Sequence, residues 1–127
     1  MYEGSKKMTG KPHLLIAEDE LFIAMMLEDI LTDEGYRVSG VTALGEGLIA
    51  AERGNFDAAI LDVNLGRDLV FPLAERLRDQ GVPLMFASGY GSEGIPEDFS
   101  GYEVLLKPFD SKTLLAALSK LVTPPAK

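Results

Sequence analysis

Five short apolar runs alternate along the chain with segments of helical periodicity, and this alternation restricts the fold more than any other feature. Strands that are buried on both faces read as nearly continuous hydrophobic runs. A chain that alternates such strands with helices builds a parallel sheet covered by helices on both faces. The sequence therefore predicts an α/β fold with a doubly wound, five-stranded parallel sheet. The expected strands are His13–Ala17, Tyr36–Thr42, Ala58–Leu61, Val82–Ala87 and Glu103–Leu106.

Segments with the periodicity of helices lie between these runs. After Leu21 apolar residues recur one helical turn apart, and Gly35 supplies a common helix stop. We expect a loop over Val63–Arg67 and only a short or irregular helix in Ser88–Tyr102, which is rich in Gly, Ser and Pro. The expected helices are Leu21–Glu34, Leu44–Arg53, Asp68–Gln80 and Ser111–Val122, the last capped near Asp110 or Ser111.

Length and charge limit the classes of function. The 127 residues suit one domain, expected over residues 12–122 between a flexible tail at 1–11 and a tail at 123–127, with no output domain attached. The net charge of -8 repels phosphate backbones and anionic lipids, so we expect no nucleic-acid or membrane partner. The sequence contains no cysteine, no signal peptide and no apolar run long enough to span a bilayer. We expect a cytoplasmic protein.

Polar residues follow four of the five expected strands. Glu18 and Asp19 come after the first strand, Asp62 after the third, Ser88 after the fourth and Lys107 after the fifth. The carboxyl ends of parallel strands meet at one edge of the sheet, where α/β folds bind their ligands. Alone, each residue has an ordinary explanation, such as a helix start or a turn. Because all of them are expected at the same edge of the predicted sheet, a functional site is favoured.

The chemistry of this set points to a metal and a phosphoryl group. Three carboxylates at one edge repel each other unless a cation neutralises them, and Mg²⁺ prefers such oxygen ligands. Asp19 and Asp62 are the expected direct ligands, and Glu18 is expected to act through water. Lys107 can pair with Asp62 at rest and with a phosphoryl oxygen later, and the Ser88 hydroxyl can donate to another phosphoryl oxygen. Such groups stabilise phosphoryl transfer to a carboxylate.

Four motifs carry a resemblance to a known family. LLIAEDE, AAILDVNLG, FASGYG and LLKPF lie within about Pro12 to Leu121 and together resemble the receiver domain of two-component response regulators. The resemblance implies a flavodoxin-like receiver fold, a backbone carbonyl of Asn64 on the metal and a candidate cis peptide at Lys107–Pro108. It also implies a phospho-acceptor at Asp62, an acidic pocket of Glu18 and Asp19, a switch hydroxyl at Ser88 and a pocket lysine at Lys107.

The chain departs from the common receiver pattern at one position. Common receivers carry a rotating aromatic residue three positions before the pocket lysine, and this chain has Val104 there. FASGYG instead resembles the Phe-Ala-Thr-Gly-x-Tyr type of motif in a receiver subgroup known from alphaproteobacteria, with Ser88 in place of Thr. That subgroup also lacks the aromatic. Tyr90 is therefore the candidate that takes over the role of the missing aromatic residue in the switch.

Three apolar residues early in the first expected helix have two interpretations. Phe22, Met25 and Met26 are either ordinary core residues or an exposed surface that adapts to a helical partner. By resemblance, the first helix of a receiver contacts the four-helix bundle that bears the phospho-histidine. We assign the three residues to partner binding.

The preferred interpretation is a phospho-accepting receiver of a two-component system or phosphorelay. A histidine kinase or histidine phosphotransfer protein would pass a phosphoryl group to Asp62, the segment Ser88–Tyr102 would rearrange, and binding to an unidentified downstream protein would change. Such a domain catalyses its own phosphorylation and dephosphorylation but is not a conventional enzyme.

Two alternatives remain. A Mg²⁺-dependent aspartyl-phosphate phosphatase or phosphotransferase for a small molecule typically has a second Asp two residues after the nucleophile, where this chain has Asn64, and such an enzyme also needs a lid domain. A receiver-like interaction module that takes no phosphate would not need the complete pocket.

Overall fold

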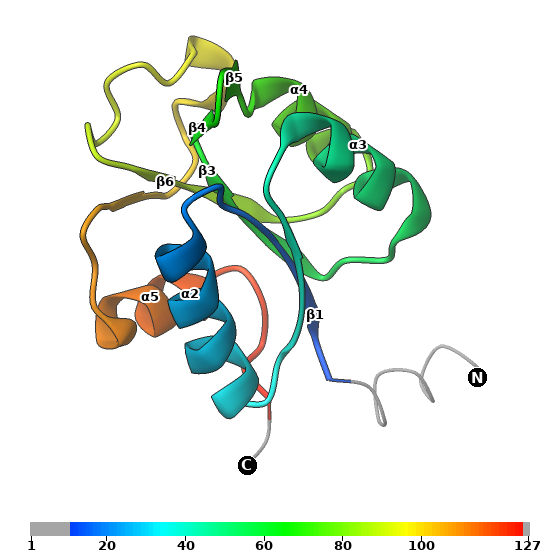
Figure 1. Cartoon of the computed structure of the whole chain (residues 1–127), viewed down its shortest axis with the longest axis vertical. Helices are drawn as coiled ribbons and strands as arrows, with labels where there is room; N and C mark the ends of the chain where they lie inside the picture. Colours follow the sequence, from blue (N-terminus) through cyan, green and yellow to red (C-terminus); the bar gives the residue numbers. More distant parts are fainter. Residues whose placement is uncertain (1–10, 126–127) are drawn as a thin grey trace.

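The computed structural model describes residues 11–125, and its central element is one five-stranded parallel sheet (Figure 1). The order of the strands is β2-β1-β3-β6-β7, and every neighbouring pair is parallel. The predicted α/β architecture is confirmed. The strands are β1 (His13–Ala17), β2 (Arg37–Val41), β3 (Ala58–Asp62), β6 (Leu84–Ser88) and β7 (Val104–Leu106).

Within the described residues, four α-helices cover the two faces of this sheet. Figure 1 shows α2 (Leu21–Asp33) and α5 (Ser111–Leu118) on one face, and α3 (Leu44–Arg53) and α4 (Phe71–Asp79) on the other. Helix α5 begins where it was expected, because the Asp110 carboxylate accepts a hydrogen bond from the Thr113 amide at 2.8 Å. The result is a three-layer fold with its core in two parts.

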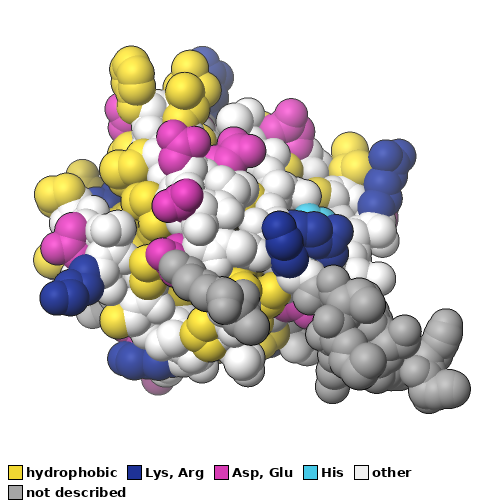
Figure 2. Space-filling model, turned by 90° about the horizontal axis from the view of Figure 1, so that it is seen from below, with side chains coloured by type: hydrophobic (Ala, Val, Ile, Leu, Met, Phe, Trp, Pro, Cys, Tyr) yellow, Lys and Arg dark blue, Asp and Glu magenta, His cyan; other side chains and the backbone are white. Residues whose placement is uncertain are grey.

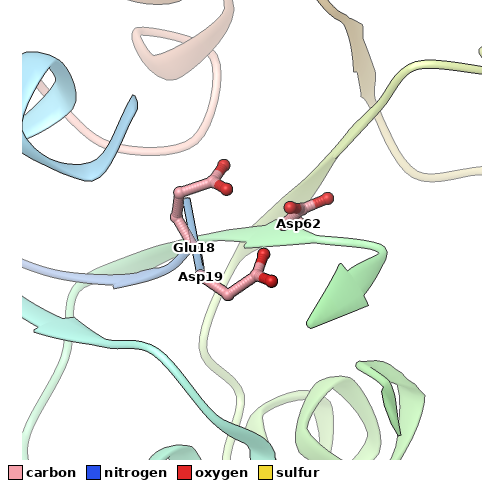
Figure 3. Close-up of side chains that lie close together, drawn as sticks. All are labelled: Glu18, Asp19 and Asp62. Carbon is pink, nitrogen blue, oxygen red and sulfur yellow. The ribbon is translucent and has the colours of Figure 1, made fainter. Parts of the chain in front are cut away.

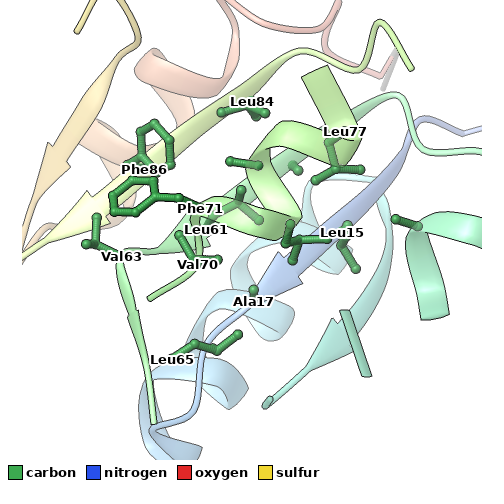
Figure 4. Packing of buried hydrophobic residues seen from close by; sticks show 14 of the residues in the cluster. Leu15, Ala17, Leu61, Val63, Leu65, Val70, Phe71, Leu77, Leu84 and Phe86 are labelled. Carbon is green, nitrogen blue, oxygen red and sulfur yellow. The ribbon is translucent and has the colours of Figure 1, made fainter. Parts of the chain in front are cut away.

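The two parts of the core follow from the alternation of side chains along each strand. In β1, Leu15 and Ala17 belong to the cluster under α3 and α4, whereas Leu14 and Ile16 belong to the cluster under α2 and α5. All residues of β3 are buried, as expected for a central strand covered on both faces. Figure 4 shows the packing of the first cluster between the sheet and α4.

The largest departure from the predicted elements lies after β3. The expected loop and the first residues of the expected helix form a small antiparallel hairpin of β4 (Asn64–Leu65) and β5 (Asp68–Leu69). Helix α4 consequently begins at Phe71 and not at Asp68, with Pro72 in its first turn, where its missing N–H costs nothing. The periodicity of apolar residues does not reveal the hairpin, because tertiary contacts stabilise it.

Smaller differences affect the other boundaries. Strand β6 begins at Leu84 instead of Val82 and includes Ser88. Helix α5 ends at Leu118, although the Leu121 and Val122 amides still donate to the Leu118 carbonyl, so a final turn continues the helical pattern. Such shifts are ordinary at frayed helix and strand ends.

The segment between β6 and β7 contains only one turn of 3₁₀-helix, Glu97–Phe99, which confirms the expected short or irregular helix. Phe99 is 1% exposed and anchors the segment to the core. The Arg78 guanidinium lies 4.8 Å from the centre of the Phe99 ring. The rings that surround Phe99 belong to Phe71, Phe86 and Tyr102.

Acidic and large apolar side chains are both exposed on the surface. Figure 2 shows one face on which Asp and Glu side chains gather beside apolar side chains that stand out from the surface. Among residues 11–125, no helix is both long and apolar enough to cross a membrane. The expected tail over residues 1–11 lies outside the described residues, apart from Lys11, as do residues 126 and 127.

Candidate functional site

The polar residues predicted at the strand ends meet at one edge of the sheet. Glu18 and Asp19 follow β1, and Asp62 is the last residue of β3, which runs parallel to β1 and next to it. Carboxylate oxygens of these three residues lie within 4.8 Å of one another. Figure 3 shows the side chains of Glu18 and Asp19 at the end of β1 with Asp62 beside them.

Lys107 reaches this acidic cluster from the end of β7. Its Nζ atom lies 3.0 Å from Asp62 Oδ2 and 3.1 Å from Glu18 Oε1. The Lys107 amide donates a hydrogen bond of 2.9 Å to the Ser88 carbonyl and thereby extends the pairing of β6 with β7. The predicted cis peptide at Lys107–Pro108 is confirmed. The predicted pairing of Lys107 with Asp62 is present, and its contact with Glu18 was not predicted.

Burial and the contacts between Lys107 and the carboxylates shift the pKa values of this cluster in opposite directions. Glu18 is 2% exposed and Asp62 is 7% exposed. Burial raises the pKa of Glu18, the Asp62 charge raises it further, and the Glu20 amide and Lys107 act in the opposite direction. Burial alone would lower the pKa of Lys107, but its hydrogen bonds to Asp62 and Glu18 outweigh this, and the pKa is raised.

The donor set fits a divalent cation. Within residues 11–125, three carboxylates meet here and Lys107 is the cation paired with two of them, Glu18 and Asp62, so negative charge remains in excess. All candidate ligand atoms are oxygens, which suits a hard cation such as Mg²⁺. The cluster could therefore hold a metal ion.

Asp19 has a contact that sequence reasoning missed. Its Oδ2 atom accepts a hydrogen bond of 3.0 Å from the Gly66 amide, 47 positions away along the chain. Gly66 lies in the turn of the β4–β5 hairpin and has a φ of +67°. A glycine between Leu65 and Arg67 was a signal for a tight turn, but it did not reveal the partner.

Ser88 and Tyr90 lie beside the cluster at the end of β6. Ser88 is buried, and its Oγ atom accepts a hydrogen bond of 3.0 Å from the Tyr90 amide, which leaves the hydroxyl hydrogen available to donate. The Tyr90 side chain is 71% exposed. Val104, at the position of the missing aromatic residue, packs partly buried against the core.

The remaining predicted site residues are exposed. Asn64 lies in β4, two residues beyond Asp62, with an exposed side chain. On α2 the exposed fractions are 80% for Phe22, 52% for Met25 and 40% for Met26. The interpretation of these three residues as ordinary core residues is therefore wrong, because the buried residues of α2 are Leu27 and Leu31.

Comparison with known proteins identifies the family. Residues 14–119 match the response regulator receiver domain. The chain belongs to this family. The receiver is 35% identical over 115 residues to the uncharacterized transcriptional regulatory protein YkoG of Bacillus subtilis, which covers 85% of this chain and 50% of the relative. It is 32% identical over 118 residues to the aerobic respiration control protein ArcA of Escherichia coli, and the match covers 88% of this chain and 49% of the relative.

Solved structures agree with this assignment. The receiver superimposes on the solution structure of SdrG from Sphingomonas melonis with a TM-score of 0.77 and 40% identity, covering 87% of this chain and 96% of that one. A CheY-like receiver from Methanospirillum hungatei gives a TM-score of 0.78 with 25% identity, and the match covers 87% of this chain and 93% of that one. The chain spans about half the length of the curated relatives it matches.

Membership of this family defines the class of function. The chain is a receiver domain of a two-component system and a signalling module, not a conventional enzyme. A receiver domain implies a histidine kinase as partner. The predicted family and fold are confirmed, and the Glu18, Asp19 and Asp62 cluster is consistent with a phospho-accepting site.

Proposed function

We propose that Asp62 accepts a phosphoryl group from the phospho-histidine of a histidine kinase or a histidine phosphotransfer protein. The phosphorus–nitrogen bond of the donor breaks, a bond forms between phosphorus and an Asp62 carboxylate oxygen, and the leaving ring nitrogen keeps the electron pair and takes a proton. The observation that supports this role most is the 3.0 Å contact of Asp62 Oδ2 with Lys107 within a cluster of carboxylates. Lys107 neutralises charge on the acceptor and, afterwards, on a phosphoryl oxygen.

Mg²⁺ is the cofactor that we propose for this transfer. Asp19 and Asp62 would hold it directly, Glu18 through water, and Asn64 through its backbone carbonyl. When bound, the ion would offset negative charge on the phosphoryl oxygens. The all-oxygen donor set and its excess negative charge support this assignment.

Ser88 and Tyr90 are the proposed switch. The Ser88 hydroxyl would donate to a phosphoryl oxygen, and the Tyr90 amide, which now donates to Ser88 Oγ, couples that change to the segment after β6. Gly91 and Gly94 have positive φ angles in this segment, a backbone state that glycine adopts readily. Phosphorylation would therefore bias the conformation of the segment between β6 and β7.

The exposed side chains of Phe22, Met25 and Met26 form the proposed docking surface for the phosphodonor. They lie near the start of α2, which follows directly after Glu18 and Asp19, so a partner bound there would be close to Asp62. Flexible methionine side chains adapt to a helical partner. A separate, unidentified downstream protein would read the phosphorylated state. The phosphoryl transfer would take place in the cytoplasm, the compartment expected from the sequence.

Mass spectrometry tests the proposed acceptor. The intact protein treated with acetyl phosphate and Mg²⁺ should gain the mass of one phosphoryl group, and Asp62→Asn should gain none. Asp33→Asn, which changes an exposed aspartate on α2, is the matched control and should react like the wild type. A phosphoryl mass on Asp62→Asn would show that another residue is the acceptor.

A further inference from the structure

We propose that the main-chain amide of Gly66 positions the Asp19 carboxylate for the divalent cation, so that the β4–β5 hairpin is a structural part of the metal site. This inference rests on the metal site of the proposed function. It assigns a positioning role to a residue whose side chain carries no chemistry.

The contact restrains an otherwise exposed side chain. Within residues 11–125, the Asp19 carboxylate accepts one hydrogen bond, and its donor is the Gly66 amide. It occupies one carboxylate oxygen and leaves the other free for a cation. Figure 3 shows the Asp19 carboxylate beside Asp62, with the chain beyond Asp62 turning back toward Asp19. A hydrogen bond to an ionised carboxylate is among the stronger ones in proteins.

The hairpin presents this amide in a fixed orientation. The Val70 amide donates to the Val63 carbonyl at 3.0 Å, and Asn64 pairs with Leu69. Leu65 and Val70 are 2% and 0% exposed, so two buried side chains anchor the hairpin to the core. Gly66 has a positive φ and Arg67 does not, which is the pattern of a type II′ turn with glycine in its first central position.

The hairpin also connects the two proposed direct ligands. Its first strand, β4, starts at Asn64, two residues after Asp62, and its turn contacts Asp19, two residues after the end of β1. Asp62 and Asp19 are thus held together through the four residues 63–66 and one hydrogen bond, as well as through the pairing of β1 with β3. Groups that orient a metal ligand raise metal affinity, and their loss typically costs about 10–100-fold.

A pair of substitutions at Gly66 tests the inference. Gly66→Val places a β-branched residue at a positive φ and should disturb the turn, whereas Gly66→Asn tolerates that conformation and keeps the amide in its orientation. In calorimetric titration with Mg²⁺, Gly66→Val should bind about tenfold more weakly than the wild type, and Gly66→Asn should bind nearly as well. If Gly66→Val does not fold, Gly66→Ala replaces it, because alanine is also strained at this positive φ although its Cβ, 4.0 Å from Asp19 Oδ2, meets no clash.

A second measurement examines the contact without metal. In NMR spectra recorded with a chelator, Asp19→Ala should shift the Gly66 amide proton and speed its exchange with solvent. Glu20→Ala, which changes the neighbouring exposed carboxylate, is the matched control and should leave the Gly66 amide unchanged. An unchanged Gly66 amide in Asp19→Ala would overturn the proposed contact.

The outcomes separate this inference from the proposed function. If the wild type binds no Mg²⁺, the metal site itself is wrong, and the positioning role is overturned with it. If the wild type binds Mg²⁺ and the disturbed turn binds it equally well, only the role of Gly66 is overturned. Weaker binding by both Gly66→Val and Gly66→Asn would also contradict it, because a turn that keeps the amide in its orientation would then not preserve binding.

Discussion

Lys107 Nζ lies 3.0 Å from Asp62 Oδ2, although the two residues are 45 positions apart in sequence. Lys107 follows the end of β7 and Asp62 ends β3, and β6 lies between these two strands. The same ammonium group lies 3.1 Å from Glu18 Oε1. One lysine therefore partners two buried carboxylates. This shared contact makes the electrostatic balance of the site sensitive to any change at Lys107.

Loss of the Lys107 ammonium group should destabilise the protein. In Lys107→Ala, Glu18 and Asp62 stay buried without their cation, and we expect the free energy of unfolding to fall by roughly 1–3 kcal/mol. Urea unfolding in the presence of a chelator measures this. Lys112→Ala, an exposed lysine in the first turn of α5, is the control and should change little. Equal stabilities of the two variants would show that the Lys107 contacts contribute nothing to folding.

The two acidic residues after β1 should differ in their effect on metal binding. Asp19→Asn should lower Mg²⁺ affinity about tenfold or more, because it removes charge from a direct ligand. Glu18→Gln should have a smaller effect, because Glu18 is proposed to act through water and already contacts Lys107. Calorimetric titration of both variants, with Glu20→Gln as control, gives the ranking. Equal losses of affinity would refute it.

The readout of phosphorylation should pass through the end of β6. Ser88→Ala should still accept phosphate on Asp62 but respond weakly, because it lacks the hydroxyl that donates to the phosphoryl oxygen. Tyr90→Ala should uncouple the following segment with less effect on the chemistry. Hydrogen exchange on the free and beryllofluoride-treated proteins measures this response. We expect the wild type to change in residues 89–102.

The contrary outcome for this readout is specific. If residues 89–102 exchanged equally in both states of the wild type while another helix changed, a route through Ser88 and Tyr90 would be wrong. Phe22→Ala is a suitable control, because it removes an exposed ring from α2 and should leave the exchange response of residues 89–102 intact.

His13 should make stability depend on pH far from the site. It lies at the start of β1, and its Nε2 atom is 2.7 Å from Ser39 Oγ. Burial lowers the pKa of His13 from its ordinary 6.5, and Arg37 adds to this, while the Asn55 backbone and Asp57 act in the opposite direction. The folded state therefore binds fewer protons than the unfolded state between the lowered pKa and 6.5. Stability should fall as the pH drops below 6.5 and reach its plateau above that value.

Because His13 is the single histidine of the chain, the effect can be isolated. His13→Gln should remove the loss of stability just below the ordinary histidine pKa while the acid limb caused by the carboxylates remains. Urea unfolding of both proteins at a series of pH values from about 5 to 8 measures the difference. Parallel curves for the two proteins over that range would mean that His13 titrates alike in the folded and unfolded states.

The amino-acid sequence alone determined the sheet and the edge that carries the site. The strands around Leu14–Ala17 and Ala58–Leu61 are buried on both faces, so they appear as continuous apolar runs that any reader of the sequence can find. Parallel pairing then brings their carboxyl ends together, which places Asp19 beside Asp62 without further information. The placement of Lys107 follows from the same rule.

Only the tertiary structure decided how these groups contact one another. Periodicity tells which face a residue occupies, but not which side-chain rotamer or backbone turn brings two atoms within hydrogen-bonding distance. The Glu18–Lys107 pair and the Gly66–Asp19 bond each join distant segments, and they depend on the path of the chain between them. The exposure of Phe22 was likewise undecided, because a ring at helical spacing suits a core or a surface until the neighbouring elements are in place.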